Sequence, residues 1–368
     1  MKPSPIFLSD STAGDPSMNI SSILEDLTMP KPVINDELYF YLMFILQGTV
    51  CQAITIFGIF TNIINVIIFV KQGFSDTINV SLLALSISDL SSLLLIMWTN
   101  LCFSPAIRDS NIPMVTTEVH LITGTWPHIV FTRITGWITA FISLERCVCV
   151  IQPLKVKTMF TRKRHVIAMV AIFTLTMGLS SFGYIPGGLG WKFYPDRNKT
   201  LIGIAYHLGE DGRKYTDAVS YAISGIFMPI SCFLSVVILT TILVVKLNQK
   251  MAWRQSNSSA VIQSKQKSTS DGVVNSKERK IAKMVVLMSV IFIASFLPAV
   301  IVFFTGIIVP TFNYDKLDRN LVFVMMSLTN TAEVINSSVN IFIYIRMSSK
   351  YRETFLKLFK LKTTVNNR

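Results

Sequence analysis

The chain has 368 residues, a formal net charge of +13 and a mean hydropathy of +0.52. Only 15% of its residues are charged, whereas an ordinary soluble domain is about a quarter charged, so the composition excludes a soluble globular protein. The basic surplus does not indicate a nucleic-acid partner, because the charges fall between long apolar stretches.

Seven apolar stretches are each long enough to cross a bilayer, which takes about 20 mostly apolar residues. Backbone amides find no water in hydrocarbon, so such segments cross only as helices that satisfy their own hydrogen bonds. The sequence therefore predicts an all-α membrane protein, a bundle of seven transmembrane helices. The expected spans are 44–70, 78–101, 125–150, 166–186, 219–245, 282–307 and 321–345.

Basic residues are distributed unequally between the segments that connect these spans. Alternate segments, from the first connection to the carboxyl-terminal tail, hold 22 of the 34 Lys and Arg residues. The other segments hold 11, counting Arg133 near the outer end of the third span, and Arg146 is the remaining one. The positive-inside rule therefore places the amino terminus outside and the carboxyl terminus in the cytoplasm. We expect a multi-pass plasma-membrane protein with extracellular glycosylation at Asn19 and Asn198.

Three regions are expected in chain order. Residues 1–38 form an extracellular tail that is too short and polar to bury a core and is expected to be disordered. Residues 39–346 form the seven-helix domain, whose polar segment 246–278 is expected to be a solvated linker. Residues 347–368 form a cytoplasmic helix and tail.

The cytoplasmic helix is expected to be amphipathic. Tyr351, Phe355 and Phe359 recur every four residues, and lysines occupy the other side. This periodicity is typical of a short helix that lies on membrane lipids, with basic groups toward anionic headgroups.

The cysteines are placed unusually for a surface protein. Cys102 stands alone at the outer end of the second span, and the outer loop of about 187–217 contains no cysteine. The other four lie within spans. We therefore expect no extracellular disulfide, although the compartment would permit one.

Several polar side chains lie within the spans, where an unpaired polar group is costly and often marks function. Asp89 needs a cation, a proton or several hydrogen-bond donors. Asn336, Ser337 and Asn340 of the last span supply oxygens and amides, so we expect a hydrated polar pocket at the bundle centre. Asn62 fits either an interhelical hydrogen bond or a switching role.

The third span ends in Glu145-Arg146-Cys147, and Pro153 follows. This pattern resembles that of rhodopsin-like (class A) G-protein-coupled receptors, whose third helix ends in an acidic-Arg-aromatic triplet with Pro seven residues after the Arg. One triplet would be weak, but further matches occur in order along the chain. They are Asn62, Leu85, Asp89, Pro229, Pro298, Asn340, Tyr344, Tyr351 and Arg352.

The resemblance implies a receptor that recruits a heterotrimeric G protein, with arrestin and receptor kinases as further partners. It implies that Arg146 pairs with Glu145 at rest and then turns toward the G protein. Glu278 would be a second partner of Arg146, or simply part of a solvated charge run. The implied coupling and switch residues are Glu145, Arg146, Pro153, Glu278, Asn340, Tyr344, Phe292, Phe296, Pro298 and Pro229.

Two further features follow from the same resemblance. Pro229 and Pro298 each remove a helical hydrogen bond, which would give hinges for an outward movement of the sixth helix. A sodium and water pocket would surround Asp89, so an allosteric sodium ion is implied and no other cofactor. The implied pocket residues are Asp89, Thr135, Asn336, Ser337 and Asn340.

The chain also departs from the family pattern. Phe296 replaces the Trp of the sixth-helix switch motif, to which Phe292 also belongs, and Ile341 replaces the Pro of the seventh-helix motif. Val237 stands where the fifth helix often has Tyr, and Leu121 replaces the third-helix Cys. Since the remaining switch residues are intact, we interpret the chain as a divergent branch.

Residues expected in the outer part of the bundle indicate which class of ligand would fit. His128 stands where amine receptors carry Asp, which disfavours a biogenic amine. Arg133 and Glu333 either pair with each other or bind ligand separately, with Glu333 receiving a cationic group and Arg133 an anionic one. The expected pocket residues are His128, Thr132, Arg133, Phe296 and Glu333.

The chain looks most similar to invertebrate neuropeptide receptors of the FMRFamide-receptor type, and it also resembles invertebrate orphan and chemosensory receptors. We expect an extracellular ligand, a short neuropeptide first and a small environmental molecule as the alternative. A seven-helix ligand-gated channel of the insect-odorant type would have a cytoplasmic amino terminus, which contradicts the charge distribution. Asp89 is the only Asp within a span and the four histidines are scattered, so we assign no enzyme activity, no catalytic residue and no other metal site.

Overall fold

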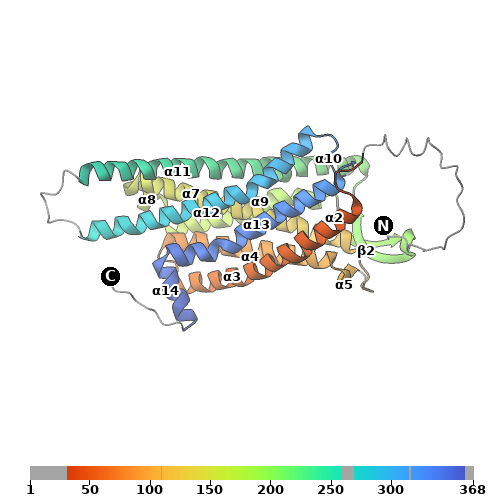
Figure 1. Cartoon of the computed structure of the whole chain (residues 1–368), viewed down its shortest axis with the longest axis horizontal. Helices are drawn as coiled ribbons and strands as arrows, with labels where there is room; N and C mark the ends of the chain where they lie inside the picture. The colour runs from red at the N-terminus through yellow and green to blue at the C-terminus, as the bar shows by residue number, and fades with distance from the viewer. Residues whose placement is uncertain (1–30, 109, 259–268, 315, 361–368) are drawn as a thin grey trace, which may run out of the picture.

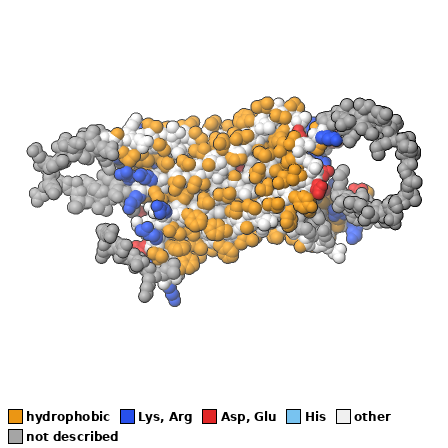
Figure 2. Space-filling model, viewed as in Figure 1, with side chains coloured by type: hydrophobic (Ala, Val, Ile, Leu, Met, Phe, Trp, Pro, Cys, Tyr) orange, Lys and Arg blue, Asp and Glu red, His pale blue; other side chains and the backbone are white. Residues whose placement is uncertain are grey.

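Long helices lie side by side along the longest axis of the molecule (Figure 1). The structure is a computed structural model that describes residues 31–108, 110–258, 269–314 and 316–360. Hydrophobic side chains cover the middle of the visible face, and charged side chains gather toward its two ends (Figure 2). Such an apolar belt is the surface that a transmembrane bundle presents to lipid.

Several long helices are built from consecutive short elements. The described elements of the first half are α2 (Asp36–Met43), η1 (Phe44–Cys51), α3 (Gln52–Gln72), α4 (Thr77–Phe103), α5 (Pro105–Arg108), α6 (Thr116–His120), η2 (Leu121–Thr125), α7 (Trp126–Ile151), α8 (Pro153–Met159), α9 (Arg162–Ser180) and η3 (Ser181–Tyr184). The described elements that follow are β1 (Gly187–Tyr194), η4 (Pro195–Arg197), β2 (Lys199–Tyr206), α10 (Glu210–Ser220), η5 (Tyr221–Phe227), α11 (Met228–Ser258), α12 (Thr269–Ile308), α13 (Arg319–Met347) and α14 (Ser349–Leu358).

Six helices in the described part of the chain are long and apolar enough to cross a membrane. They contain five of the first six expected spans in full, and the fourth expected span, 166–186, extends two residues beyond its helix, which ends at Tyr184. The seventh expected span, 321–345, forms α13, which packs against α3, α4 and α12 but falls outside those six. Buried Asn, Ser and Thr side chains and Glu333 make α13 polar, so its crossing of the membrane stays a prediction.

Helix α7 occupies the middle of the bundle, where it packs against α4, α9, α11 and α12. The π-helical segments η1, η2 and η5 interrupt three of the long helices near the end that carries α2, α10 and the β-strands (Figure 1). We call this end the hairpin end and the opposite end the α14 end. Single π-helical turns inside helices frequently occur at functional sites.

Local sequence sets several helix boundaries. The side chain of Asn35 accepts a hydrogen bond from the backbone amide of Leu38 at 2.8 Å and so begins α2. Thr161 and Ser348 cap α9 and α14 in the same way. Gly73 ends α3 at a φ of 70°, a left-handed conformation that glycine adopts without a steric penalty.

Helices extend past the ends of two expected regions. Helix α2 begins at Asp36, within the expected tail 1–38, and Asn19 lies outside the described residues. Helix α11 continues to Ser258 and α12 begins at Thr269, so both helices reach into the expected linker 246–278. Asn198 lies between η4 and β2 in a left-handed conformation with φ 46°.

The prediction of helices alone missed a two-stranded antiparallel sheet. Strand β1 pairs with β2 from Gly187 opposite Tyr206 to Tyr194 opposite Lys199. None of the five cysteines forms a disulfide, so no such bond fastens this hairpin to the bundle. Backbone pairing joins it to the preceding loop instead, with the amide of Val115 donating to the carbonyl of Ile202 at 2.8 Å.

Glu118 supplies a second attachment of the hairpin. One carboxylate oxygen of Glu118 accepts hydrogen bonds from the Tyr194 hydroxyl and from the Ile204 amide, both at 2.8 Å. Burial and the neighbouring Glu118 carboxylate raise the pKa of Tyr194 to about 12, so this phenol stays protonated and able to donate at neutral pH. A carboxylate at the start of the third long helix thus anchors both strands.

Helices α3 and α13 approach closely at Gly58. A Cβ atom at this position would overlap the Ser338 hydroxyl and press against Leu93. Small residues at such crossings let helix backbones come together where no hydrophobic force drives them within lipid.

We expect Gly58→Val to lower the thermal stability of the purified protein, because overpacking a tight contact costs about 1–3 kcal/mol. Gly178→Val is the matched control, since a Cβ at Gly178 meets nothing within 4 Å. Melting temperatures in the same detergent compare the two. An equal effect of both substitutions would contradict the close packing at Gly58.

Candidate functional site

A carboxylate lies at the centre of the bundle with three hydrogen-bond donors around it. Asp89 is fully buried on α4. Its Oδ1 accepts from the Thr135 hydroxyl at 2.8 Å and from the Ser337 hydroxyl at 3.2 Å, and its Oδ2 accepts from the Asn340 amide at 2.9 Å. Donors from α7 and α13 therefore take the place of water around a buried charge.

The composition of this cluster suits a hard cation. A carboxylate and two hydroxyls present oxygen atoms, the ligand type that hard cations prefer. Asn336, the fifth residue of the expected pocket, is buried on α13 but has no described hydrogen bond to Asp89. No group of three or more His, Cys, Asp or Glu side chains gathers within the described residues, so Asp89 acts here as a single carboxylate.

A chain of hydrogen bonds leads from α13 beside this cluster to α14. The Asn62 amide donates to the backbone carbonyl of Ser337 at 2.8 Å, and the Asn65 amide donates to Asn62 Oδ1 at 3.3 Å. The Tyr351 hydroxyl then donates to Asn65 Oδ1 at 2.5 Å. Burial raises the pKa of Tyr351, so the phenol stays a donor. Helix α14 is thereby tied to the bundle interior.

The Glu145–Arg146 motif lies near the end of α7 at the α14 end. Nη2 of Arg146 donates to Oε1 of Glu145 at 2.5 Å, and both side chains are buried. Nε2 of His165 on α9 lies 3.3 Å from the same oxygen, and the Thr77 hydroxyl donates to it at 3.4 Å. The side chains of Pro153 and Glu278 fall outside the described part, although Pro153 begins α8 and Glu278 lies within α12.

The residues expected to switch the sixth helix form an aromatic stack. The rings of Phe292 and Phe296 lie 4.2 Å apart at an interplanar angle of 26°, and they pack with Ala140 and Cys232. Pro298 lies inside α12, which continues to Ile308. These contacts join α7, α11 and α12.

Pro229 marks a second irregular place. It is the second residue of α11, and only Met228 separates it from the π-helical segment Tyr221–Phe227. Pro lacks a backbone N–H, so one helical hydrogen bond is missing close to the end of the π-helical segment. The π-helical segment and Pro229 are therefore two causes of bending that follow each other in the same long helix.

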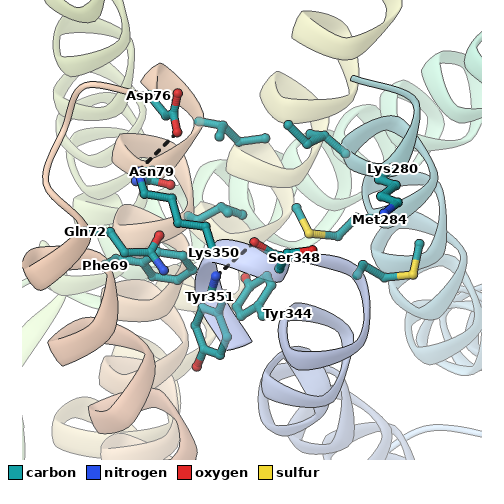
Figure 3. Close-up of a pocket in the computed structure, with 15 residues that line it drawn as sticks. Phe69, Gln72, Asp76, Asn79, Lys280, Met284, Tyr344, Ser348, Lys350 and Tyr351 are labelled. Carbon is teal, nitrogen blue, oxygen red and sulfur yellow. Dashed lines mark hydrogen bonds and ion pairs between the residues drawn. The ribbon is translucent and has the colours of Figure 1, made fainter. Parts of the chain in front are cut away.

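A cavity of about 350 Å³ opens at the α14 end between α3, α4, α12, α13 and α14 (Figure 3). Its wall includes the Tyr344 ring, which packs edge-on against Phe69 at 5.2 Å. The Tyr344 hydroxyl is buried without a described partner. Lys280 and Lys350 contribute positive charge to the rim, although Lys350 also binds Asp76 at 3.2 Å.

The expected ligand residues lie toward the hairpin end, on α7, α12 and α13. Nδ1 of His128 lies 2.9 Å from the Ser92 hydroxyl and 3.1 Å from the Ser92 carbonyl. Nε2 of His128 lies 3.8 Å from Glu333 Oε2. The structure forms no described ion pair between Arg133 and Glu333, and Nε of Arg133 is buried without a hydrogen-bond partner.

Thr132 is turned away from these groups, since its hydroxyl donates to the carbonyl of Ile129 within α7. Phe296 lies in the aromatic stack rather than beside His128. Among the five expected residues, the structure therefore brings only His128 and Glu333 into direct contact.

Sequence reasoning missed two participants and one contact. His165 binds Glu145 of the expected motif, and Ser92 holds the ring of His128. Tyr351 was among the sequence matches, but its hydrogen bond with Asn65 was not expected. A His at the edge of a span is a detectable signal for His165. Spacing in the sequence gave no signal for the other two contacts, because the partners lie on different helices.

Comparison with known families agrees with this architecture. A family model described as serpentine type 7TM GPCR chemoreceptor Srw matches residues 49–362, which is most of the chain. The chain belongs to this family of G-protein-coupled receptors and is a multi-pass membrane protein. A ligand and a G protein are accordingly its general partners, and the family is not one of enzymes. Comparison with the curated proteins gave no match.

Proposed function

We propose that the protein is a chemosensory receptor that binds a small molecule from outside the cell and activates a heterotrimeric G protein inside it. The family description supports chemoreception. The observation that carries the coupling role is the buried Glu145–Arg146 pair at the α14 end. A guanidinium exchanges one acceptor for another readily, so this pair suits a two-state switch.

The proposed orientation has the hairpin end outside and the α14 end in the cytoplasm of a plasma-membrane receptor. The excess of Lys and Arg in the segments at the α14 end supports it. In this orientation the cavity beside Tyr344 and Lys280 faces the G protein. Movement of α12 about Pro298 would widen it, and a ligand drives that movement only by binding the active state more tightly.

The proposed ligand site lies between α4, α7 and α13 around His128, Arg133 and Glu333. The buried Nε of Arg133 lacks a partner, and a buried donor of this kind gains free energy when an acceptor binds it. We therefore propose an anionic or strongly accepting group on the ligand.

A short neuropeptide is the second candidate ligand. The contact that favours it is the one between Glu333 and His128 at 3.8 Å, which is too long for a hydrogen bond. A cationic group, such as an Arg side chain of a peptide, would offer this carboxylate a closer partner.

We further propose a sodium ion as an allosteric ligand at Asp89, held with the hydroxyl oxygens of Thr135 and Ser337. Sodium chloride is expected to raise the melting temperature of the receptor above that in N-methylglucamine chloride at equal ionic strength. Asp89→Asn is expected to remove the difference, because the amide lacks the negative charge. If the melting temperatures in the two salts still differ in Asp89→Asn, the sodium site at Asp89 is contradicted.

Arg146→Ala is expected to reduce second-messenger responses to the level of cells without the receptor, at equal surface expression. The measurement is a screen of small-molecule and peptide libraries in cells that express the chain. Ion currents recorded in parallel provide the comparison with a channel. Ligand-evoked currents unaffected by Arg146→Ala, without second-messenger responses, would contradict the proposed function.

Two substitutions separate the ligand classes. Arg133→Gln is expected to weaken an anionic agonist about tenfold or more, since hydrogen bonds to charged groups contribute about 1.5–3 kcal/mol. Glu333→Gln is expected to do the same only for a cationic agonist. Potency of the agonists found in the screen is measured for both variants. Unchanged potency in both would exclude these two side chains as ligand contacts.

A further inference from the structure

A buried histidine touches the coupling motif from a neighbouring helix. His165 lies in the first turns of α9 and is fully buried, with its ring edge-on to Phe141 and Phe160 at 5.3 and 5.8 Å. Its Nδ1 lies 3.2 Å from the backbone carbonyl of Thr161. Its Nε2 lies 3.3 Å from Oε1 of Glu145, at ion-pair distance.

The two ring nitrogens of His165 face acceptors on both sides. A carbonyl has no hydrogen to give, so Nδ1 must carry a proton and donate it to Thr161. A neutral ring would then turn the lone pair of Nε2 toward an ionised carboxylate, which repels it. The contact with Glu145 therefore requires one more proton, either on Nε2 or on the carboxyl group.

One oxygen of Glu145 carries all of its described polar contacts. Oε1 is shared by Arg146 from α7, His165 from α9 and Thr77 from α4, whereas Oε2 is buried without a partner. A guanidinium and an imidazole thus meet on a single carboxylate oxygen. When one of them leaves, the other remains to compensate the buried charge.

We propose that His165 is a positioning residue of the coupling switch, which keeps Glu145 paired when Arg146 leaves and so lowers the cost of activation. This inference rests on the proposed coupling role of Arg146. Without His165, release of Arg146 would strand an ionised carboxylate inside the bundle with only a hydroxyl beside it.

The groups around His165 come from several helices. From α7 it faces Glu145 and, through that carboxylate, Arg146. On its own helix, Arg162, Lys163 and Arg164 precede it. From α4 the neutral Thr77 shares the same carboxylate oxygen, while Asp76 next to Thr77 binds Lys350. Phe160, just after α8, contributes an uncharged ring.

The first test does not need a G protein. The melting temperature of the purified receptor is measured for the wild type, Arg146→Ala, His165→Phe and the double variant. Phenylalanine keeps the ring that packs on Phe141. We expect Arg146→Ala to cost several degrees more in the His165→Phe background, because Glu145 then loses both of its nitrogen partners. Equal losses in the two backgrounds would overturn the inference.

The second test measures basal nucleotide exchange on a G protein by receptor in lipid nanodiscs. His165→Phe is expected to lower basal exchange several-fold, because no ring nitrogen then holds Glu145 when Arg146 leaves. His165→Gln, which keeps a hydrogen-bond donor, is expected to restore most of the exchange. Equal exchange in His165→Phe and the wild type, or no recovery in His165→Gln, would contradict the role.

His207→Phe is the matched control, because this histidine is exposed beside the hairpin and is expected to change neither measurement. The two tests also separate this inference from the proposed function. A receptor that never drives exchange, yet shows the coupled melting losses, would refute the proposed function and leave the pairing of His165 with Glu145 intact. Exchange with additive melting losses would refute only the role of His165.

Discussion

Every polar group inside this bundle must find its partner within the bundle, because the bilayer offers none. Asp89 illustrates the constraint most clearly. Its carboxylate receives donors from α7 and α13, so these helices cannot rotate independently without leaving a buried charge unpaired. The chain from Asn62 through Asn65 to Tyr351 extends the same constraint to α14. Polar contacts thereby determine which helix faces meet.

The same constraint explains why the α14 end suits a switch. Glu145 is held by groups from several helices at once, and alternative partners allow a change of arrangement without a bare charge. The Tyr344 hydroxyl lacks a partner beside the cavity. Partly satisfied groups of this kind favour a second arrangement that satisfies them better.

Much of the fold could be predicted because hydrophobic length alone identifies membrane helices. Six spans agree with helices of the structure, and the neighbours of Asp89 followed from familiar motifs. The hairpin could not be predicted this way, since β1 and β2 are glycine-containing segments within a loop and carry no membrane signal. The contacts of His165 and Ser92 depend on how helices are rotated. Rotation is set by packing that periodicity does not encode.

The hairpin has a consequence for how the protein matures. Its strands are held by mutual backbone pairing, by the pairing of Val115 with Ile202 and by the carboxylate of Glu118. None of these attachments is covalent, and none of the five cysteines forms a disulfide. Assembly of the hairpin end therefore consumes no oxidant and needs no thiol exchange. This end of the bundle forms equally well whatever the redox potential of the compartment in which the chain folds.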